Sequence, residues 1–337
     1  MTIFLGGDVM TGRGIDQILP RPSHPRIYES FVQDARDYVG LAERANGPIP
    51  SRVAFSYVWG DAIEELHRVG PAARIVNVET SVTRSDDYWV GKGINYRMHP
   101  SNVPTLTSAR IDVAVLANNH VLDYGPAGLQ ETLDTLKRAG VRTAGAGRDL
   151  AEAQRPAIVE LSEQARMIVL AFGLESSGIP PSWAARWERP GISFLGGLSQ
   201  LAASTIIERV KQIKRQNDLV VVSFHWGDNW GYEVPAEHVR FAHWLIDGGV
   251  DILHGHSSHH PRPVEVYRNR LILYGCGDLL NDYEGIAGFE EFRNDLAVMY
   301  FVSVSPTGEL LGLRMMPMQI RKFRLNRVSA TDAQWLR

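Results

Sequence analysis

The stretch from Leu219 to His260 of this 337-residue chain is rich in histidine, a side chain that binds metal ions and transfers protons near neutral pH. Carboxylate and amide side chains follow three apolar runs nearer the amino terminus. Imidazole, carboxylate and amide oxygen together suit Zn, Fe, Mn or Mg, and a pair of such ions can clamp a phosphate and activate water. The set therefore indicates a divalent-cation site for hydrolysis of a phosphoester or a related bond. Its members are Asp8, Asn77, Glu79, Asn118, Asn119, His120, His225, His254, His256, His259 and His260.

Five short apolar runs directly precede these polar residues, and such runs are typical of buried parallel strands. The runs are residues 3–7, 74–76, 113–117, 219–224 and 250–253. Open α/β sheets place their ligand sites at the carboxyl ends of such strands. We therefore expect five separate segments to deliver Asp, Glu, Asn and His side chains to one cavity.

Segments with helical periodicity lie between the expected strands. Helices are predicted for residues 126–139, 198–216 and 235–248, where apolar residues recur at helical spacing. Short strands, expected to be antiparallel, are predicted for residues 264–267, 271–276, 296–304 and 310–316. The patterns predict a layered α/β fold with a central, mostly parallel sheet, a second meandering sheet, and helices on the flanks.

Composition and charge argue against several classes of protein. The net charge is −3 and Lys and Arg are scattered along the chain, which does not favour nucleic-acid binding. No apolar run approaches the length of about 18 residues that a membrane span needs, and the first expected strand begins at Thr2, which leaves no room for a signal region. We therefore expect a cytoplasmic protein with no membrane partner. Because no linker rich in Gly, Ser or Pro interrupts the chain, we expect one domain over residues 1–337; the oligomeric state is left open.

Five motifs occur in an order that resembles the CapA family, also called the poly-gamma-glutamate capsule synthesis family. They are FLGGDVM (4–10), NVET (77–80), LANNHVLDYG (116–125), FHWG (224–227) and the histidine-rich turn 254–260. The resemblance runs from residue 4 to about residue 284. The family is similar in fold to calcineurin-like metallophosphoesterases, so the resemblance implies a metallophosphoesterase-like fold for this chain.

The same resemblance implies roles for individual residues. In the metallophosphoesterase pattern, Asp8 would bind one metal ion and Glu79 would stand where a bridging carboxylate belongs. Asn119 and His225 would hold the second ion, and His120 would protonate the leaving oxygen. A histidine of the last motif would complete the ligand set. The candidates for that position are His254 and His256.

Two positions depart from the metallophosphoesterase pattern. Met10 stands where the first motif of that pattern has a histidine ligand, and a thioether suits only soft metals. The last motif allows two alignments, one on His254 and His256 and the other on Ser257 and His259. Both departures bear on whether a metal ion is bound.

Three functions remain open at this point. The first is metal-assisted hydrolysis of a phosphoester or peptide-like bond, which we favour because it explains Asn119, His120 and His225 together. The second is metal-independent peptide epimerisation, as in lasso-peptide maturation by some CapA-like proteins, with Asp8 and a histidine such as His259 as the acid and base. The third is binding of a peptide or polyanion, polyglutamate included, without chemistry. Candidate substrate-binding residues are Arg13, Asn77, Asn118, Trp226 and Asp278, the last of which could also orient a neighbouring histidine.

Overall fold

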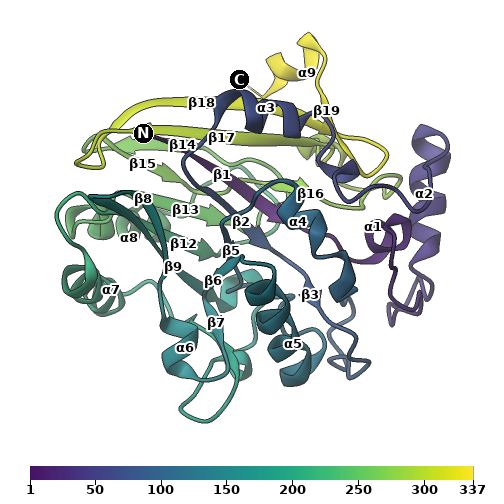
Figure 1. The fold of residues 1–337 in the computed structure, drawn as a ribbon, viewed down its shortest axis with the longest axis horizontal. Helices are drawn as coiled ribbons and strands as arrows, with labels where there is room; N and C mark the ends of the chain where they lie inside the picture. The colour runs from purple at the N-terminus through teal and green to yellow at the C-terminus, as the bar shows by residue number, and fades with distance from the viewer. Residues whose placement is uncertain (337) are drawn as a thin grey trace.

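The strands that precede the expected site residues belong to two different sheets, as the computed structural model shows (Figure 1). The structure describes residues 1–336. Within them, one sheet contains β1 (Thr2–Val9), β2 (Arg74–Val78) and β5 (Val113–Val115), which pair in parallel. The other sheet contains β12 (Leu219–His225) and β13 (Ile252–His256), also in parallel. We call them the β1 sheet and the β12 sheet.

Each sheet combines parallel and antiparallel strands. The β1 sheet has the order β19-β18-β17-β1-β2-β5-β6, with β16 beside β1. Its remaining strands are β6 (Arg142–Ala144), β16 (Asp278–Leu280), β17 (Leu296–Val304), β18 (Leu310–Ile320) and β19 (Leu325–Arg327). The β12 sheet has the order β11-β9-β12-β13-β15-β14, with β8 beside β9. Its remaining strands are β8 (Ala157–Ser162), β9 (Ala165–Leu174), β11 (Phe194–Leu195), β14 (Val264–Tyr267) and β15 (Arg270–Leu273).

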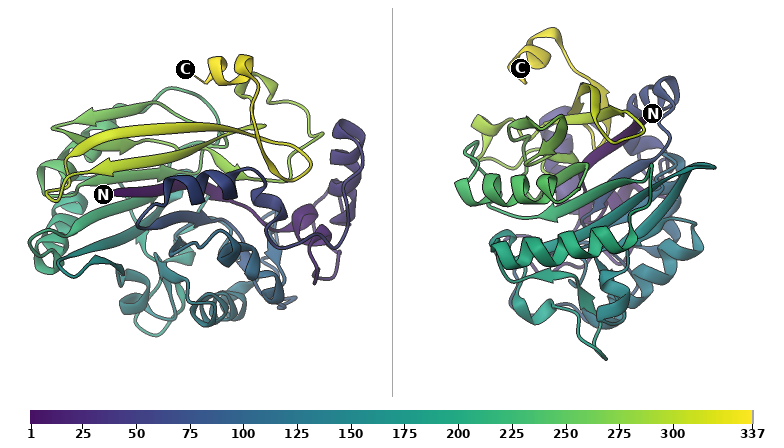
Figure 2. Two further views of the ribbon diagram at one scale, coloured as in Figure 1. Left: turned by 45° about the horizontal axis from the view of Figure 1, so that its top comes forward. Right: turned by 90° about the vertical axis from the view of Figure 1, so that its left-hand side faces the viewer.

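The two sheets pack face to face, and helices cover both outer faces (Figures 1 and 2). Side chains alternate along β1, so Ile3 and Leu5 enter the core between the sheets while Phe4 packs on the helical side. The β1 sheet is covered by α3 (Ala62–Val69), α4 (Pro104–Ser108) and α5 (Gly125–Arg138), and the β12 sheet by α7 (Gln200–Ile213) and α8 (Ala236–Asp247). The remaining elements are α1 (Arg13–Ile18), α2 (Arg36–Asn46), α6 (Leu150–Gln154), α9 (Ala330–Trp335) and the two-stranded pairs β3 (Ser81–Val82) with β4 (Arg97–Met98) and β7 (Ala146–Gly147) with β10 (Gly191–Ile192).

The layered α/β class and the three predicted helices are confirmed, but the predicted division of strands between the sheets is wrong. The five site strands do not share one central sheet, because three lie in the β1 sheet and two in the β12 sheet. The later strands do not form a separate sheet either: β14 and β15 extend the β12 sheet, while β17 and β18 extend the β1 sheet. Their hairpin partners are antiparallel as predicted, although β15 also pairs in parallel with β13. The helix predicted for residues 198–216 is shorter and spans Gln200–Ile213.

A close backbone approach at the end of β1 brings a further carboxylate to the site. A side chain on Gly7 would place its Cβ 1.8 Å from the carbonyl oxygen of Gly277, so only glycine fits there. The amide of Asp8 then donates to that same carbonyl at 3.0 Å, and β16 pairs with β1 so that Asp278 lies opposite Asp8.

Among residues 1–336, no helix has both the length and the hydropathy needed to cross a membrane.

Candidate functional site

The carboxyl ends of the five strands converge where the two sheets meet. Two overlapping groups of buried side chains hold their potential ligand atoms within 4.8 Å of one another. One group is Asp8, His225 and His256, and the other is Asp8, Glu79 and Asp278. Asp8 belongs to both groups, so it occupies the centre of the cluster.

Amide groups hold the Asp8 carboxylate in a fixed orientation. Asn77 Nδ2 donates to Asp8 Oδ1 at 2.7 Å, and the backbone amide of Ser257 donates to Oδ2 at 3.1 Å. Asn118 Nδ2 donates in turn to Asn77 Oδ1 at 2.9 Å. Asn77 and Asn118 are fully buried, so they position Asp8 and do not face solvent. Burial, followed by repulsion from Asp278, raises the pKa of Asp8 to about 7 despite these hydrogen bonds.

Glu79 lies beside Asp8 and lacks a full set of partners. Its Oε2 atom is buried and accepts no hydrogen bond within the described residues. Burial raises the pKa of Glu79 well above its ordinary value, and the carboxylates of Asp8 and Asp278 raise it further. Three ionised carboxylates crowded together out of water are costly, and either protons or a cation can neutralise them.

A chain of hydrogen bonds fixes which nitrogen of each site histidine carries a proton. Burial lowers the pKa of His225, His254 and His256, so each ring is neutral at pH 7 and donates through one nitrogen only. The Gly6 carbonyl can only accept, so His254 Nε2, 2.9 Å away, donates to it. His254 Nδ1 therefore accepts from Ser223 Oγ (3.1 Å), which itself accepts from His256 Nε2 (2.8 Å). His256 Nδ1 then accepts from His225 Nδ1 at 2.7 Å, which leaves His225 Nε2 without a proton.

This unprotonated nitrogen faces oxygen atoms. His225 Nε2 lies 3.1 Å from Asn119 Oδ1 and 3.6 Å from Glu79 Oε1. All three atoms present lone pairs to one another, which is unfavourable without a positive charge between them. Together with the unpartnered oxygen of Glu79, this arrangement fits a divalent cation. Imidazole, amide oxygen and carboxylate are the donor types that Mn, Fe, Zn and Mg accept.

Asp278 supplies a carboxylate that the sequence interpretation assigned to substrate binding or to orienting a histidine. The structure gives it a place in the second group of potential ligands. Met10, by contrast, is buried and its Sδ accepts from the amide of Gly12 at 3.2 Å. The carboxylate of Asp278 thus adds a donor to a site in which Met10 provides no hard ligand.

His120 lies at the edge of this cluster and contacts two charged residues. Its Nδ1 is 2.6 Å from Asp123 Oδ2 and 2.9 Å from Lys92 Nζ, and Lys92 also donates to Asp123. Tyr96 stacks on the imidazole with ring centroids 3.8 Å apart. Burial lowers the pKa of His120 to about 4, although Asp123 opposes this shift. Because a carboxylate oxygen can only accept, His120 Nδ1 donates to Asp123, and a neutral ring then carries no proton on Nε2.

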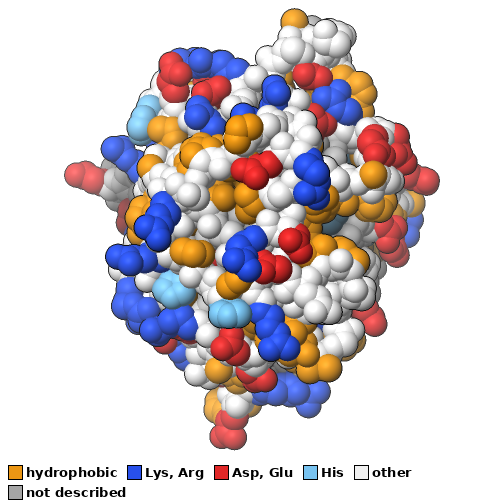
Figure 3. Space-filling view, turned by 90° about the vertical axis from the view of Figure 1, so that its right-hand side faces the viewer, with side chains coloured by type: hydrophobic (Ala, Val, Ile, Leu, Met, Phe, Trp, Pro, Cys, Tyr) orange, Lys and Arg blue, Asp and Glu red, His pale blue; other side chains and the backbone are white. Residues whose placement is uncertain are grey.

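A cleft of about 670 Å³ opens above the cluster. Asn119, His120 and His259 line it, whereas Asp8 and Glu79 lie beneath its floor. His259 Nδ1 is 3.0 Å from Asp278 Oδ1; burial would lower the pKa of His259, but the carboxylates of Asp278 and Asp8 outweigh it and raise the pKa. Figure 3 views the end of the molecule that carries α2, where apolar side chains are interspersed with charges of both signs.

Two residues assigned to the site from sequence have other positions, and a third lies at the cleft in ion pairs. His254 lies one strand repeat below His256 and uses both ring nitrogens on Ser223 and Gly6, so it belongs to the core beneath the site. Trp226 is buried on the helical side of the β12 sheet, where its indole donates to the Tyr274 carbonyl. The third residue, Arg13, does line the cleft, where its guanidinium pairs with Glu29 and Asp282.

The sequence interpretation missed Lys92 and Asp123. Asp123 stands three residues after His120 within the same motif, a spacing that could have indicated a partner for the imidazole. Lys92 comes from a loop in which the flanking Gly91 and Gly93 both have positive φ, and nothing in its sequence indicates that this loop folds over His120.

Comparisons with known proteins give a consistent result. The family model described as bacterial capsule synthesis protein PGA_cap matches residues 2–283. The chain is 48% identical over 339 residues to a probable polyglutamine synthesis accessory protein of Mycobacterium tuberculosis, a match that covers all of this chain and 89% of that protein. It is 28% identical over 303 residues to the PGA biosynthesis protein CapA of Bacillus subtilis, which covers 90% of this chain and 68% of that protein. Among solved structures, the 5'-nucleotidase precursor of Thermus thermophilus is similar in fold, with a TM-score of 0.50 and 13% identity. That match covers the whole of this chain but only 57% of the nucleotidase.

Proposed function

Because this chain belongs to the bacterial capsule synthesis protein family PGA_cap, whose members include proteins named for polyglutamate capsule synthesis, we propose that it is a metal-dependent hydrolase acting in that context. The reaction we propose is cleavage of a phosphoester or a related, peptide-like bond. The observation that carries this proposal is that three lone-pair atoms able to bind a metal ion face one another: His225 Nε2, Asn119 Oδ1 and a carboxylate oxygen of Glu79. The nucleotidase-like fold supports it.

The residues of the cluster divide into ligands and positioning groups. Asp8, Glu79, Asn119, His225 and Asp278 would hold one or two divalent ions, Mn, Fe, Zn or Mg. His256, whose ring nitrogens contact Ser223 and His225, would orient His225. Such ions supply positive charge for a substrate oxygen and lower the pKa of water. Asn77 and Asn118 keep the Asp8 carboxylate in place, which preserves the geometry of both ligand groups.

His120 has the position of a general acid. In the hydrolysis, a water oxygen forms a new bond to phosphorus and loses a proton, while the ester oxygen leaves and gains one. His120 lines the cleft, and in its imidazolium form, with Nδ1 donating to Asp123, it would give its Nε2 proton to the leaving oxygen. The ring becomes neutral in that step and takes up a proton again as it returns to the starting state, and the carboxylate of Asp123 stabilises the imidazolium.

The epimerase alternative has less support from the geometry. It requires the Asp8 carboxylate to reach a substrate Cα, but Asp8 is fully buried beneath the cleft and both of its oxygens accept hydrogen bonds. His259, the other residue of that alternative, does line the cleft. Binding of polyglutamate without chemistry is the remaining alternative, and it does not explain why Asp8, Glu79 and Asp278 cluster in the interior.

We expect turnover of bis(4-nitrophenyl) phosphate to depend on a bound divalent metal. Prolonged treatment with EDTA should lower the rate by at least about 100-fold, because the ions supply most of the charge stabilisation in such sites. Addition of Mn²⁺ to the chelated protein should restore it. A rate that is unchanged by EDTA, or a folded protein that neither binds Mn²⁺ nor cleaves the ester, would exclude the metal-dependent hydrolase and leave the epimerase and the binding protein as candidates.

A further inference from the structure

The cleft above the candidate site has an apolar wall that is unusually open to solvent. Phe31 is 68% exposed, Phe289 40% and Ile286 38%, and all three line the same cleft. They come from two segments that lie far apart in the chain. Ile94 lines the cleft with them. We call these four side chains the apolar vestibule.

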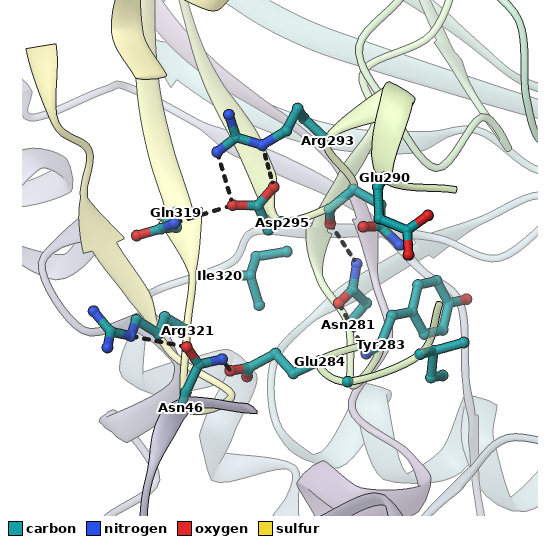
Figure 4. Close-up of a pocket in the computed structure, with 13 residues that line it drawn as sticks. Asn46, Asn281, Tyr283, Glu284, Glu290, Arg293, Asp295, Gln319, Ile320 and Arg321 are labelled. Carbon is teal, nitrogen blue, oxygen red and sulfur yellow. Dashed lines mark hydrogen bonds and ion pairs between the residues drawn. The ribbon is translucent and has the colours of Figure 1, made fainter. Parts of the chain in front are cut away.

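Backbone contacts and hydrogen bonds hold the segment that carries Ile286 and Phe289 in place. Gly285 has a φ of +81°, and a Cβ there would lie 2.7 Å from the carbonyl oxygen of Leu41, so the segment that carries Ile286 and Phe289 touches α2 at the backbone. Glu284 anchors the same segment by accepting from Asn46 Nδ2 at 2.6 Å, next to a polar recess of about 270 Å³ behind the wall (Figure 4). The amides of residues 322 and 323 also donate to Glu284.

A second anchor lies deeper in the cleft. The guanidinium of Arg13 joins Glu29, on the segment that carries Phe31, to Asp282, on the segment that carries Phe289. Tyr38 OH accepts a further hydrogen bond from Arg13 at 2.9 Å. Buried ion pairs of Arg13 therefore join the two segments that carry the exposed apolar side chains.

The metal ions proposed beneath the floor and the imidazoles that line the cleft would attract an anion. Arg13 and Lys92 also line the cleft, and among the described residues no Asp or Glu does so. The charges of Arg13 and Lys92 are already paired, however, with Glu29 and Asp282 and with Asp123. The carboxylates that would hold metal ions lie below the floor. A ligand that fills the cleft therefore meets cations and imidazoles at its inner end and apolar groups at its outer end.

We propose that the substrate is an anionic ester whose reacting group carries an aromatic or branched apolar substituent, and that the apolar vestibule binds this substituent. The inference rests on the proposed function and narrows its substrate class. Phe31, Ile286 and Phe289 offer no hydrogen-bond partner to the carboxylates of a plain glutamate polymer. An apolar substituent instead removes those side chains from water.

Binding of non-hydrolysable phosphonates to the Mn²⁺-loaded protein tests the proposal by calorimetry. Benzylphosphonate should bind about tenfold more tightly than methylphosphonate, a ratio expected from burial of one small apolar group. Hexylphosphonate distinguishes an aromatic from an aliphatic preference. The Phe31→Ser and Phe289→Ser double variant should lose most of this tenfold ratio. The matched control is Trp187→Ser, which removes an 82% exposed aromatic side chain that does not line the cleft, and it should retain the ratio.

The outcomes separate this proposal from the proposed function. Equal affinities for benzyl- and methylphosphonate, no binding of either, or a ratio unaffected by the double variant would overturn the vestibule proposal. If the ratio is found but no ester is hydrolysed, the vestibule proposal stands as a ligand preference and the hydrolase proposal fails. If esters are hydrolysed without any preference for an apolar substituent, the hydrolase proposal stands and the vestibule proposal fails.

Discussion

Replacement of Asp8 by Asn is expected to remove most of the bound metal and to lower phosphodiester turnover by at least about 10³-fold. Asp8 belongs to both groups of potential ligands, so loss of its charge weakens both. Asparagine keeps the shape of the side chain, and Asn77 can still donate to its remaining oxygen. Metal content of the purified variant, measured by mass spectrometry beside its rate on bis(4-nitrophenyl) phosphate, provides the test.

The matched control for this variant is Asp16→Asn. Asp16 is also a fully buried carboxylate, but it accepts hydrogen bonds from the amides of Ser23 and His99 and from Asn102, outside the metal cluster. Its replacement should lower the free energy of unfolding and leave the metal content of the folded protein unchanged. An Asp8→Asn variant with full metal content and full activity would show that the cluster is not the metal site.

Replacement of His120 by Ala is expected to lower turnover by about 10²- to 10⁴-fold while the metal content stays the same, because the residue transfers a proton and is not among the proposed ligands. The defect should be smaller for substrates with an acidic leaving group such as 4-nitrophenol, since such a group leaves without a proton. Rates on 4-nitrophenyl and alkyl phosphodiesters therefore provide the measurement. The alkyl ester should show the larger loss.

His243→Ala is a suitable control for the loss of an imidazole. His243 lies on α8, where it contacts Glu265 at 2.8 Å and stacks on Tyr267, away from the cleft. Its replacement should leave both turnover and metal content unchanged. If His120→Ala instead loses metal, His120 acts as a ligand or supports one; if all rates are unchanged, it is not the acid.

The composition of the candidate site was largely accessible from sequence because parallel strands present their carboxyl ends at one edge. The apolar runs before Asp8, Glu79, Asn119 and His225 end where ligand-type residues begin, and the structure brings these four residues together. The period of two residues along a strand also explains Trp226, which follows His225 and therefore points to the opposite face. That position was predictable from the alternation alone.

Pairing between strands was not accessible in the same way. The apolar pattern of a strand does not indicate which other strands pair with it. The division into two sheets and the pairing of Asp278 with Asp8 therefore could not be predicted from the sequence. His254 and His256 lie on the same face of β13, two residues apart. Which of them reaches the site depends on how far β1 extends beside β13, because His254 contacts the Gly6 carbonyl of β1. Lys92 reaches His120 from a loop whose path is set by tertiary contacts.

Anomalous X-ray diffraction from crystals grown with Mn²⁺ measures the central claim most directly. We expect a strong anomalous peak within about 2.5 Å of an Asp8 or Glu79 oxygen and of His225 Nε2, with a second peak beside Asp278 if the site is dinuclear. The peak should disappear from crystals of Asp8→Asn. A crystal saturated with Mn²⁺ that shows no peak at this cluster, or shows one only elsewhere on the molecule, would contradict a metal-dependent site formed by these residues.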